Sequence, residues 1–132
     1  MRMALMMVLG AAACRPAAGG GETPAPNGGP TVVTVHQVLT TPSLAGKSVR
    51  ITGTCLGYSV PTVAKGPPPV TRSDWQLEDQ GEAVWVTGQL PSGCQATAPS
   101  TSAVTIAAEV VQDTLPALGG HGGGVRQYLV RR

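Results

Sequence analysis

Glycine and proline gather into runs that divide this chain of 132 residues and leave only short stretches for regular structure. Residues 15–30 are the longest run, in which glycine, proline and alanine fill 12 of 16 positions. Residues 119–124 are a second run, made of glycines and one histidine. Because residues 15–30 have almost nothing to bury, we expect them to form a flexible spacer. Hydrophobic residues make up 42% of the chain and charged residues 12%, so residues 31–132 are expected to form one globular domain.

An apolar segment precedes the spacer. Arg2 is its one charged residue, and residues 3–13 are apolar or small up to Cys14. This length suits the core of a signal peptide and falls short of the roughly 20 apolar residues that a membrane-spanning helix needs. We therefore expect residues 1–13 to be a cleaved leader.

The residues before Cys14, Gly10 to Ala13, resemble the lipobox of bacterial lipoproteins. The resemblance covers the first 14 residues, with Ala11 where the commonest lipobox has leucine. It implies a lipid anchor of diacylglycerol and palmitate on Cys14, a membrane as partner, and a place in the cell envelope, at the outer membrane or the periplasmic face. Arg15 follows the cysteine, so the aspartate that retains many enterobacterial lipoproteins in the inner membrane is absent. An ordinary secretory leader followed by a chance cysteine is the alternative.

Cys55 and Cys94 remain as a pair once Cys14 carries lipid. An oxidising compartment favours a disulfide between them. Closing a loop of about 40 residues would stabilise the domain by about 3–4 kcal/mol in the loop-entropy model. Two separate buried thiols are the alternative, because spacing alone does not show that the two side chains meet.

The domain contains segments in which apolar and polar residues alternate, the period of a half-buried strand. Five strands are expected, at residues 48–56, 74–78, 82–87, 103–112 and 125–130. Residues 79–81 join the second and third strands as a hairpin. Residues 58–73 form a long Pro-rich loop and residues 115–124 a long Gly-rich loop. Residues 31–45 are expected to form a short strand or a helical turn.

These elements predict an all-β fold, a small five-stranded antiparallel barrel with a short N-terminal helical or extended segment. Their order resembles the OB-fold over about residues 46–130. The resemblance is carried by Gly46, Lys47, Val49, Ile51 and Gly53 in the first strand, and by Trp75, Leu77, Asp79, Val84 and Val86 in the hairpin. A small β-sandwich and an SH3-like barrel are the alternatives.

The charge pattern gives no support to a nucleic-acid partner. The formal net charge is +2 and falls to +1 when Arg2 leaves with the leader. Binding through phosphates needs a basic stripe. Here the basic residues are interspersed with acidic ones along the chain.

Motifs for catalysis, cofactors and metals are also missing. The sequence has no Ser-His-Asp order, no Gly-rich phosphate loop and no Cys-x-x-Cys, so we expect neither enzyme activity nor a cofactor. His36 and His121 have no partner at metal-ligand spacing, so no metal site is expected. The hairpin carries four carboxylates, which are typical of a solvated turn: Asp74, Glu78, Asp79 and Glu82.

Candidate ligand-binding residues follow from the OB-fold resemblance. OB-folds bind ligands on the face of the second and third strands, between the first and last long loops. Val84 and Val86 are expected to face the barrel interior, which turns Trp85 outward as the leading candidate. Tyr58 and Arg72 in the first long loop are further candidates. The alternative is that Trp85 packs under that loop or covers the barrel mouth.

We therefore expect a lipid-anchored, non-catalytic envelope module that binds a protein or a small molecule. An OB-fold nucleic-acid-binding protein is one alternative. A structural envelope lipoprotein, in which the anchor matters more than any pocket, is the other.

Overall fold

The computed structural model describes residues 29–58, 61–115 and 123–132. The expected leader, the lipidated Cys14, most of the spacer and His121 lie outside the described residues.

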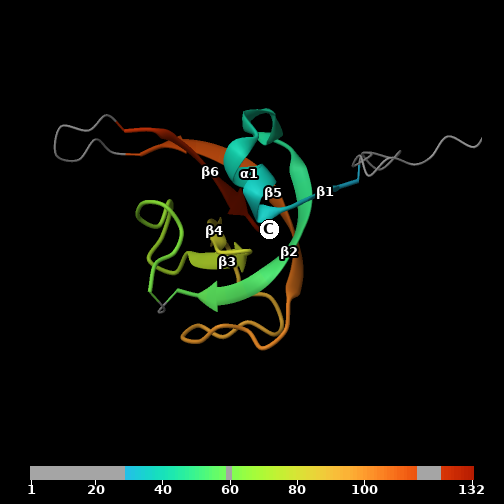
Figure 1. Cartoon of the computed structure of the whole chain (residues 1–132), viewed down its shortest axis with the longest axis vertical. Helices are drawn as coiled ribbons and strands as arrows, with labels where there is room; N and C mark the ends of the chain where they lie inside the picture. The colour runs from blue at the N-terminus through green and yellow to red at the C-terminus, as the bar shows by residue number, and fades with distance from the viewer. Residues whose placement is uncertain (1–28, 59–60, 116–122) are drawn as a thin grey trace, which may run out of the picture.

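Five strands close into a barrel (Figure 1). Their order around the barrel is β2 (Ser48–Gly57), β3 (Trp75–Asp79), β4 (Glu82–Thr87), β6 (Val125–Val130) and β5 (Val104–Thr114), and β5 pairs with β2 to close the ring. The expected all-β fold with a small five-stranded barrel is confirmed.

The barrel is mixed rather than wholly antiparallel. β4 and β6 run parallel, whereas the other four pairs of the ring are antiparallel. The reason is geometric: a closed ring with an odd number of strands cannot alternate direction throughout, so at least one neighbouring pair must be parallel.

The N-terminal segment forms both a strand and a helix. β1 (Thr31–Val33) pairs in parallel with β2 and adds a sixth strand outside the ring. α1 (Val35–Thr40) follows, and a single 3-10 turn, η1 (Pro42–Leu44), ends the segment. Thr34 and Gln37 form a capping box at the start of α1, which satisfies main-chain N–H groups that the short helix leaves free.

The core fills the barrel interior with alternate residues of the strands, closed at one end by Val35 and Val38 of α1. Trp75 and Leu77 of β3 are fully buried in it, as their shared side of the strand predicts. The indole Nε1 of Trp75 donates to the Gly88 carbonyl at 3.2 Å, so its one polar group is satisfied.

The backbone requires glycine at Gly81 and at Gly53. The turn between β3 and β4 has Gln80 at φ 53° and Gly81 at φ 83°, the left-handed pair that a two-residue hairpin turn requires. β2 pairs with β5 up to Gly53 and with β3 from Thr54 onward. A Cβ at Gly53 would lie 2.6 Å from the Glu78 carbonyl oxygen, so only glycine fits this crossing.

The disulfide expected between Cys55 and Cys94 is present, with 5.7 Å between the two Cα atoms. It joins β2 to the connection between β4 and β5, a segment without regular structure. None of the helices in the described part of the chain has the length and apolar character to cross a membrane.

Candidate functional site

The long Pro-rich loop folds back over the outer face of β3, β4 and β6 instead of standing free. In Figure 1 it is the yellow-green loop beside β3 and β4. Gln76, which is 1% exposed on β3, accepts the main-chain N–H groups of Val63 and Ala64 at 2.7 Å each. One amide side chain thus fixes the loop across the sheet.

Asp74 holds the end of the loop where it enters β3. Its buried carboxylate accepts hydrogen bonds from the main-chain N–H groups of Val70 and Thr71 and from the hydroxyls of Thr71 and Thr87. These hydrogen bonds offset the cost of burying the carboxylate, so Asp74 has a structural role and holds the loop against the barrel.

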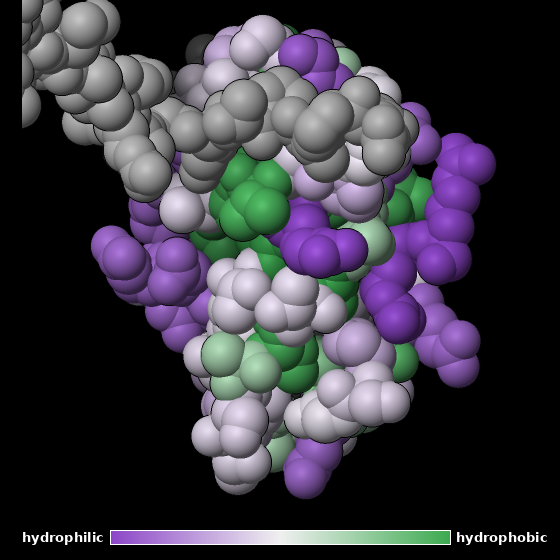
Figure 2. Space-filling view, turned by 90° about the vertical axis from the view of Figure 1, so that its right-hand side faces the viewer, coloured by the Kyte–Doolittle hydropathy of each residue, from purple (hydrophilic) through white to green (hydrophobic). Residues whose placement is uncertain are grey.

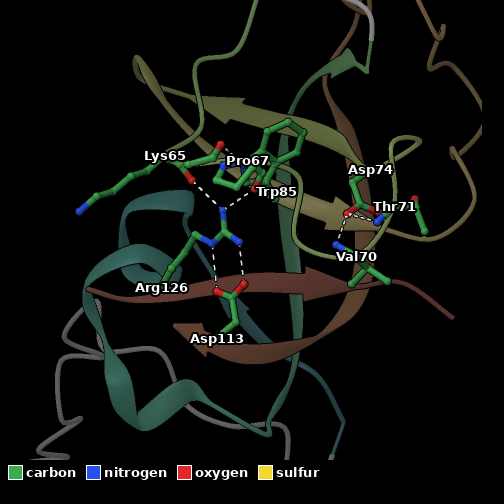
Figure 3. Close-up of polar contacts among 9 residues, drawn as sticks. Lys65, Pro67, Val70, Thr71, Asp74, Trp85, Asp113 and Arg126 are labelled. Carbon is green, nitrogen blue, oxygen red and sulfur yellow. Dashed lines mark hydrogen bonds and ion pairs between the residues drawn. The ribbon is translucent and has the colours of Figure 1, made fainter. Parts of the chain in front are cut away.

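Arg126 of β6 holds the middle of the loop (Figure 3). Its guanidinium donates to the carbonyl oxygens of Lys65 at 2.9 Å and Pro67 at 2.6 Å. It also forms a two-bond ion pair with the carboxylate of Asp113, at 3.0 Å and 2.6 Å. The side chain is 6% exposed, so this arginine belongs to the interior of the loop–barrel interface.

Trp85 lies under the loop, so the alternative that it packs there is confirmed and an exposed Trp85 is excluded. Val84 and Val86 do face the core, so Trp85 does point out of the barrel. It is nevertheless only 4% exposed, because the loop covers it and the Gly66 carbonyl accepts its indole N–H at 3.2 Å. It packs in a second apolar cluster with Ala64, Ala83 and Tyr128.

The three candidate residues do not converge on one site. Tyr58 is 42% exposed at the start of the loop, and Arg72 is exposed near its end. Neither lines the pocket to which Trp85 belongs.

That pocket has a volume of about 280 Å³ and lies between the loop, β4, β6 and α1. Its walls include Leu39, Val63, Val84, Trp85, Val125 and Arg126. Val63 and Val125, which are 51% and 67% exposed, stand at its rim. The sequence analysis did not identify Leu39, Val63 or Val125 as site residues. The sequence offered one sign of the two valines: Val63 lies within a polar loop and Val125 directly follows one.

Charged groups around the pocket are few. Lys65 and Glu82 line it, and Glu82 also contacts His36, with 2.8 Å between the carboxylate oxygen and the imidazole Nδ1. Burial raises the pKa of the Tyr128 hydroxyl above its ordinary value of 10.0, and the carboxylates of Asp113 and Asp74 raise it further against an opposing effect of Arg126. No group of three His, Cys, Asp or Glu side chains in residues 29–58, 61–115 and 123–132 is arranged to hold a metal ion.

A second hollow, of about 320 Å³, lies beside Pro30 at the start of the domain. Small and charged residues dominate its walls, including Ser48, Ala107, Glu109 and Arg132. Figure 2 shows the side of the molecule that faces right in Figure 1, where β1 begins; hydrophobic residues form only a narrow band there, broken by hydrophilic side chains. The pocket beside Trp85 is therefore the better candidate for an apolar contact.

Comparison with known proteins returned no match among family models, curated proteins or solved structures. The candidate function therefore depends on the site itself.

Proposed function

We propose that this protein is a lipid-anchored, non-catalytic binding module of the bacterial cell envelope, and that it binds a protein partner through the pocket beside Trp85. The lipobox resemblance at Cys14 supports the anchor. The Cys55–Cys94 disulfide supports an oxidising compartment. The OB-fold resemblance of residues 46–130 is compatible with a ring of five strands in the observed order.

The observation that carries the proposal is the apolar rim of the pocket. Val63 and Val125 are two of the five large hydrophobic residues that are exposed in the described part of the chain, and both border the same hollow. Exposed apolar groups beside a pocket mark interaction sites, because a partner's side chain removes them from water.

The size of the pocket favours a protein over a free small molecule. Ligand pockets usually have about 300–1,000 Å³ and bury most of the ligand. The observed volume of about 280 Å³ is slightly below that range and suits one apolar side chain of a larger partner.

The polar groups behind the pocket support a non-catalytic role. Arg126, Gln76 and Asp74 each form hydrogen bonds to the loop, and Arg126 also pairs with Asp113. Groups engaged in this way hold a surface in shape and are poorly placed to exchange protons with a substrate.

Nucleic-acid binding is less favoured. Single strands bind by stacking bases on exposed aromatic rings. The chain has four aromatic residues, and Trp75, Trp85 and Tyr128 are 0%, 4% and 9% exposed, which leaves Tyr58 as the single exposed ring. The outer face of β3 and β4, where OB-folds bind ligands, is covered by the chain's own loop.

The position of the pocket suits a tethered module. In Figure 1 β1 enters the domain from one side, and the loop beside β3 and β4 lies on the opposite side. A partner can then approach the pocket without meeting the start of β1.

Site-specific photo-crosslinking in intact cells tests this function. A photoreactive residue replaces Val63 or Val125 at the rim, and Val32 or Val70 serves as control because they are 60% and 58% exposed elsewhere. We expect the same protein adduct from both rim positions and none from the controls. No adduct from the rim, or the same adducts from all four positions, would contradict binding through this pocket.

A further inference from the structure

The pocket is an open seam of the barrel. β4 and β6 are neighbours, yet they pair only through Val86 with Leu129 and Thr87 with Val130. Residues 82–85 of β4 pair only with β3, and residues 125–128 of β6 pair only with β5. Residues from both of these stretches, which do not pair with each other, line the pocket.

The free edge of β4 faces this seam. Gln80 and Gly81 form a two-residue turn, so Glu82 and its partner across the turn exchange hydrogen bonds. Because hydrogen-bonded and free positions alternate along a strand, Ala83 and Trp85 direct their main-chain groups away from β3. These groups therefore point into the seam.

The edge of β6 faces the same seam. The Arg131 N–H, one residue beyond β6, donates to the Thr87 carbonyl of β4 at 2.9 Å. By the same alternation, Leu129 and Gln127 direct their main-chain groups toward β4. Gln127 lies where the pairing has already ended, so its main-chain N–H and C=O also point into the pocket.

We propose that the partner binds as an extended peptide that adds to the free edge of β4 at Ala83 and Trp85, with one apolar side chain in the pocket. This inference rests on the proposed function and names the chemistry of the partner. Buried main-chain groups need hydrogen-bond partners. A peptide supplies donors and acceptors at strand spacing, and a pocket beside a strand edge then selects its side chains.

The charges of the pocket agree with an uncharged peptide segment. Lys65 and Glu82 contribute one charge of each sign. Arg126 is already paired with Asp113, so its charge is neutralised within the protein. An apolar residue flanked by small polar residues therefore fits this site without leaving a charge unpaired.

The test uses the full chain with its disulfide intact and short synthetic peptides, acetylated and amidated, with one Leu, Phe or Trp among Ser and Thr residues. Two further sets carry N-methyl groups on alternate main-chain nitrogens, one set for each register. We expect at least one parent peptide to bind and methylation of one register to weaken it about tenfold, the loss of a main-chain hydrogen bond. Binding should also slow amide exchange at Ala83 N–H.

Val125→Asp and Val70→Asp give a matched pair, since both valines are exposed but only Val125 borders the pocket. We expect the first to abolish peptide binding and the second to leave it unchanged. If Val125→Asp abolishes binding but neither methylated register weakens it more than about twofold, strand addition is overturned while the pocket function stands. If no peptide binds although the rim positions crosslink to a protein in cells, strand addition is overturned as well.

Discussion

Arg126 is one of the side chains that fix the loop to the barrel, and its contacts join segments far apart in sequence. It joins two carbonyls of the loop to a carboxylate on β5. Those acceptors are main-chain oxygens of Lys65 and Pro67, whose positions no side-chain pattern encodes. An arginine in an alternating strand is typical of a solvated face, so the sequence gives no indication of this buried position.

Arg126→Met should lower the free energy of unfolding by about 3–5 kcal/mol, because it leaves the partly buried Asp113 and two loop carbonyls without their donor. Denaturant unfolding measures this. Arg132→Met is the matched control: Arg132 pairs with Glu109 but is 82% exposed, so its change should stay within about 0.5 kcal/mol. Equal effects of the two variants would show that the loop is not held by Arg126.

Tyr128 makes the stability of the domain depend on alkaline pH. Its pKa is raised in the folded chain by burial and by Asp113 and Asp74, so folding favours the protonated phenol. The unfolded chain releases this proton near pH 10.0, and the folded chain does so only at higher pH. The contribution is therefore complete below pH 10.0 and is lost as pH rises toward the folded pKa. Tyr128→Phe should flatten this decline in chemical unfolding measured from pH 9 upward, and an unchanged slope would refute the assignment.

Trp85 shows where residue-level prediction ends. Alternation in β4 places Trp85 opposite Val84 and Val86, and the structure agrees. Exposure depends on what lies over that face, which is decided by Gln76 and Gly66 rather than by the strand itself. Tyr58 and Arg72 are exposed loop residues. The sequence analysis placed them with Trp85 in one candidate site, whereas the structure separates them from it.

At the scale of elements, the strands were predictable because each has its own alternating pattern. The five expected segments correspond to β2, β3, β4, β5 and β6 with small shifts at the ends. The parallel pairing of β4 with β6 could not be predicted from the strands alone, because it follows from closure of the ring. The pairing of β1 with β2 could not be predicted either, because it depends on the tertiary fold. The open seam, and hence the pocket, follows from these non-local pairings.

Gly66 tests how closely the loop approaches the barrel. Its φ is +77°, and a Cβ there would lie 2.5 Å from Cδ2 of Leu115 and 2.9 Å from Nη1 of Arg126. Gly46 has nearly the same φ, +80°, with no atom within 4 Å of such a Cβ. Gly46→Ala should cost about 1 kcal/mol from conformation alone, and Gly66→Ala about 1–3 kcal/mol more from overpacking.

Thermal unfolding and the combined emission of the buried Trp75 and Trp85 measure this difference. Gly66→Ala should also shift the emission to longer wavelength as water reaches the indole of Trp85. Equal losses of stability in the two variants would mean that the loop is not packed against Arg126 as described.

At the scale of the whole molecule, the loop and the seam together explain why the five-stranded barrel presents a small pocket instead of an open face. The loop occupies the outer surface of β3 and β4, and the incomplete β4–β6 pairing leaves the seam beside it. The sequence predicted the barrel and the disulfide, whereas the seam arises only when β4 and β6 are brought together by closure of the ring.

In the proposed function, the protein is exported and tethered to a membrane, and the pocket meets its partner there. The sequence supports three parts of the proposal: the leader of residues 1–13, the lipid on Cys14 and the spacer of residues 15–30. The Cys55–Cys94 bond is the part of the structure that agrees with this proposal, because disulfides persist in oxidising compartments.

The most direct test of this account is the intact mass of the protein purified from its native membrane, measured with and without a reducing agent. The account predicts loss of residues 1–13, a mass addition of lipid size on Cys14, and a gain of two protons on reduction as Cys55 and Cys94 separate. An unprocessed chain with three free thiols would contradict the envelope module and would make nucleic-acid binding the next activity to measure.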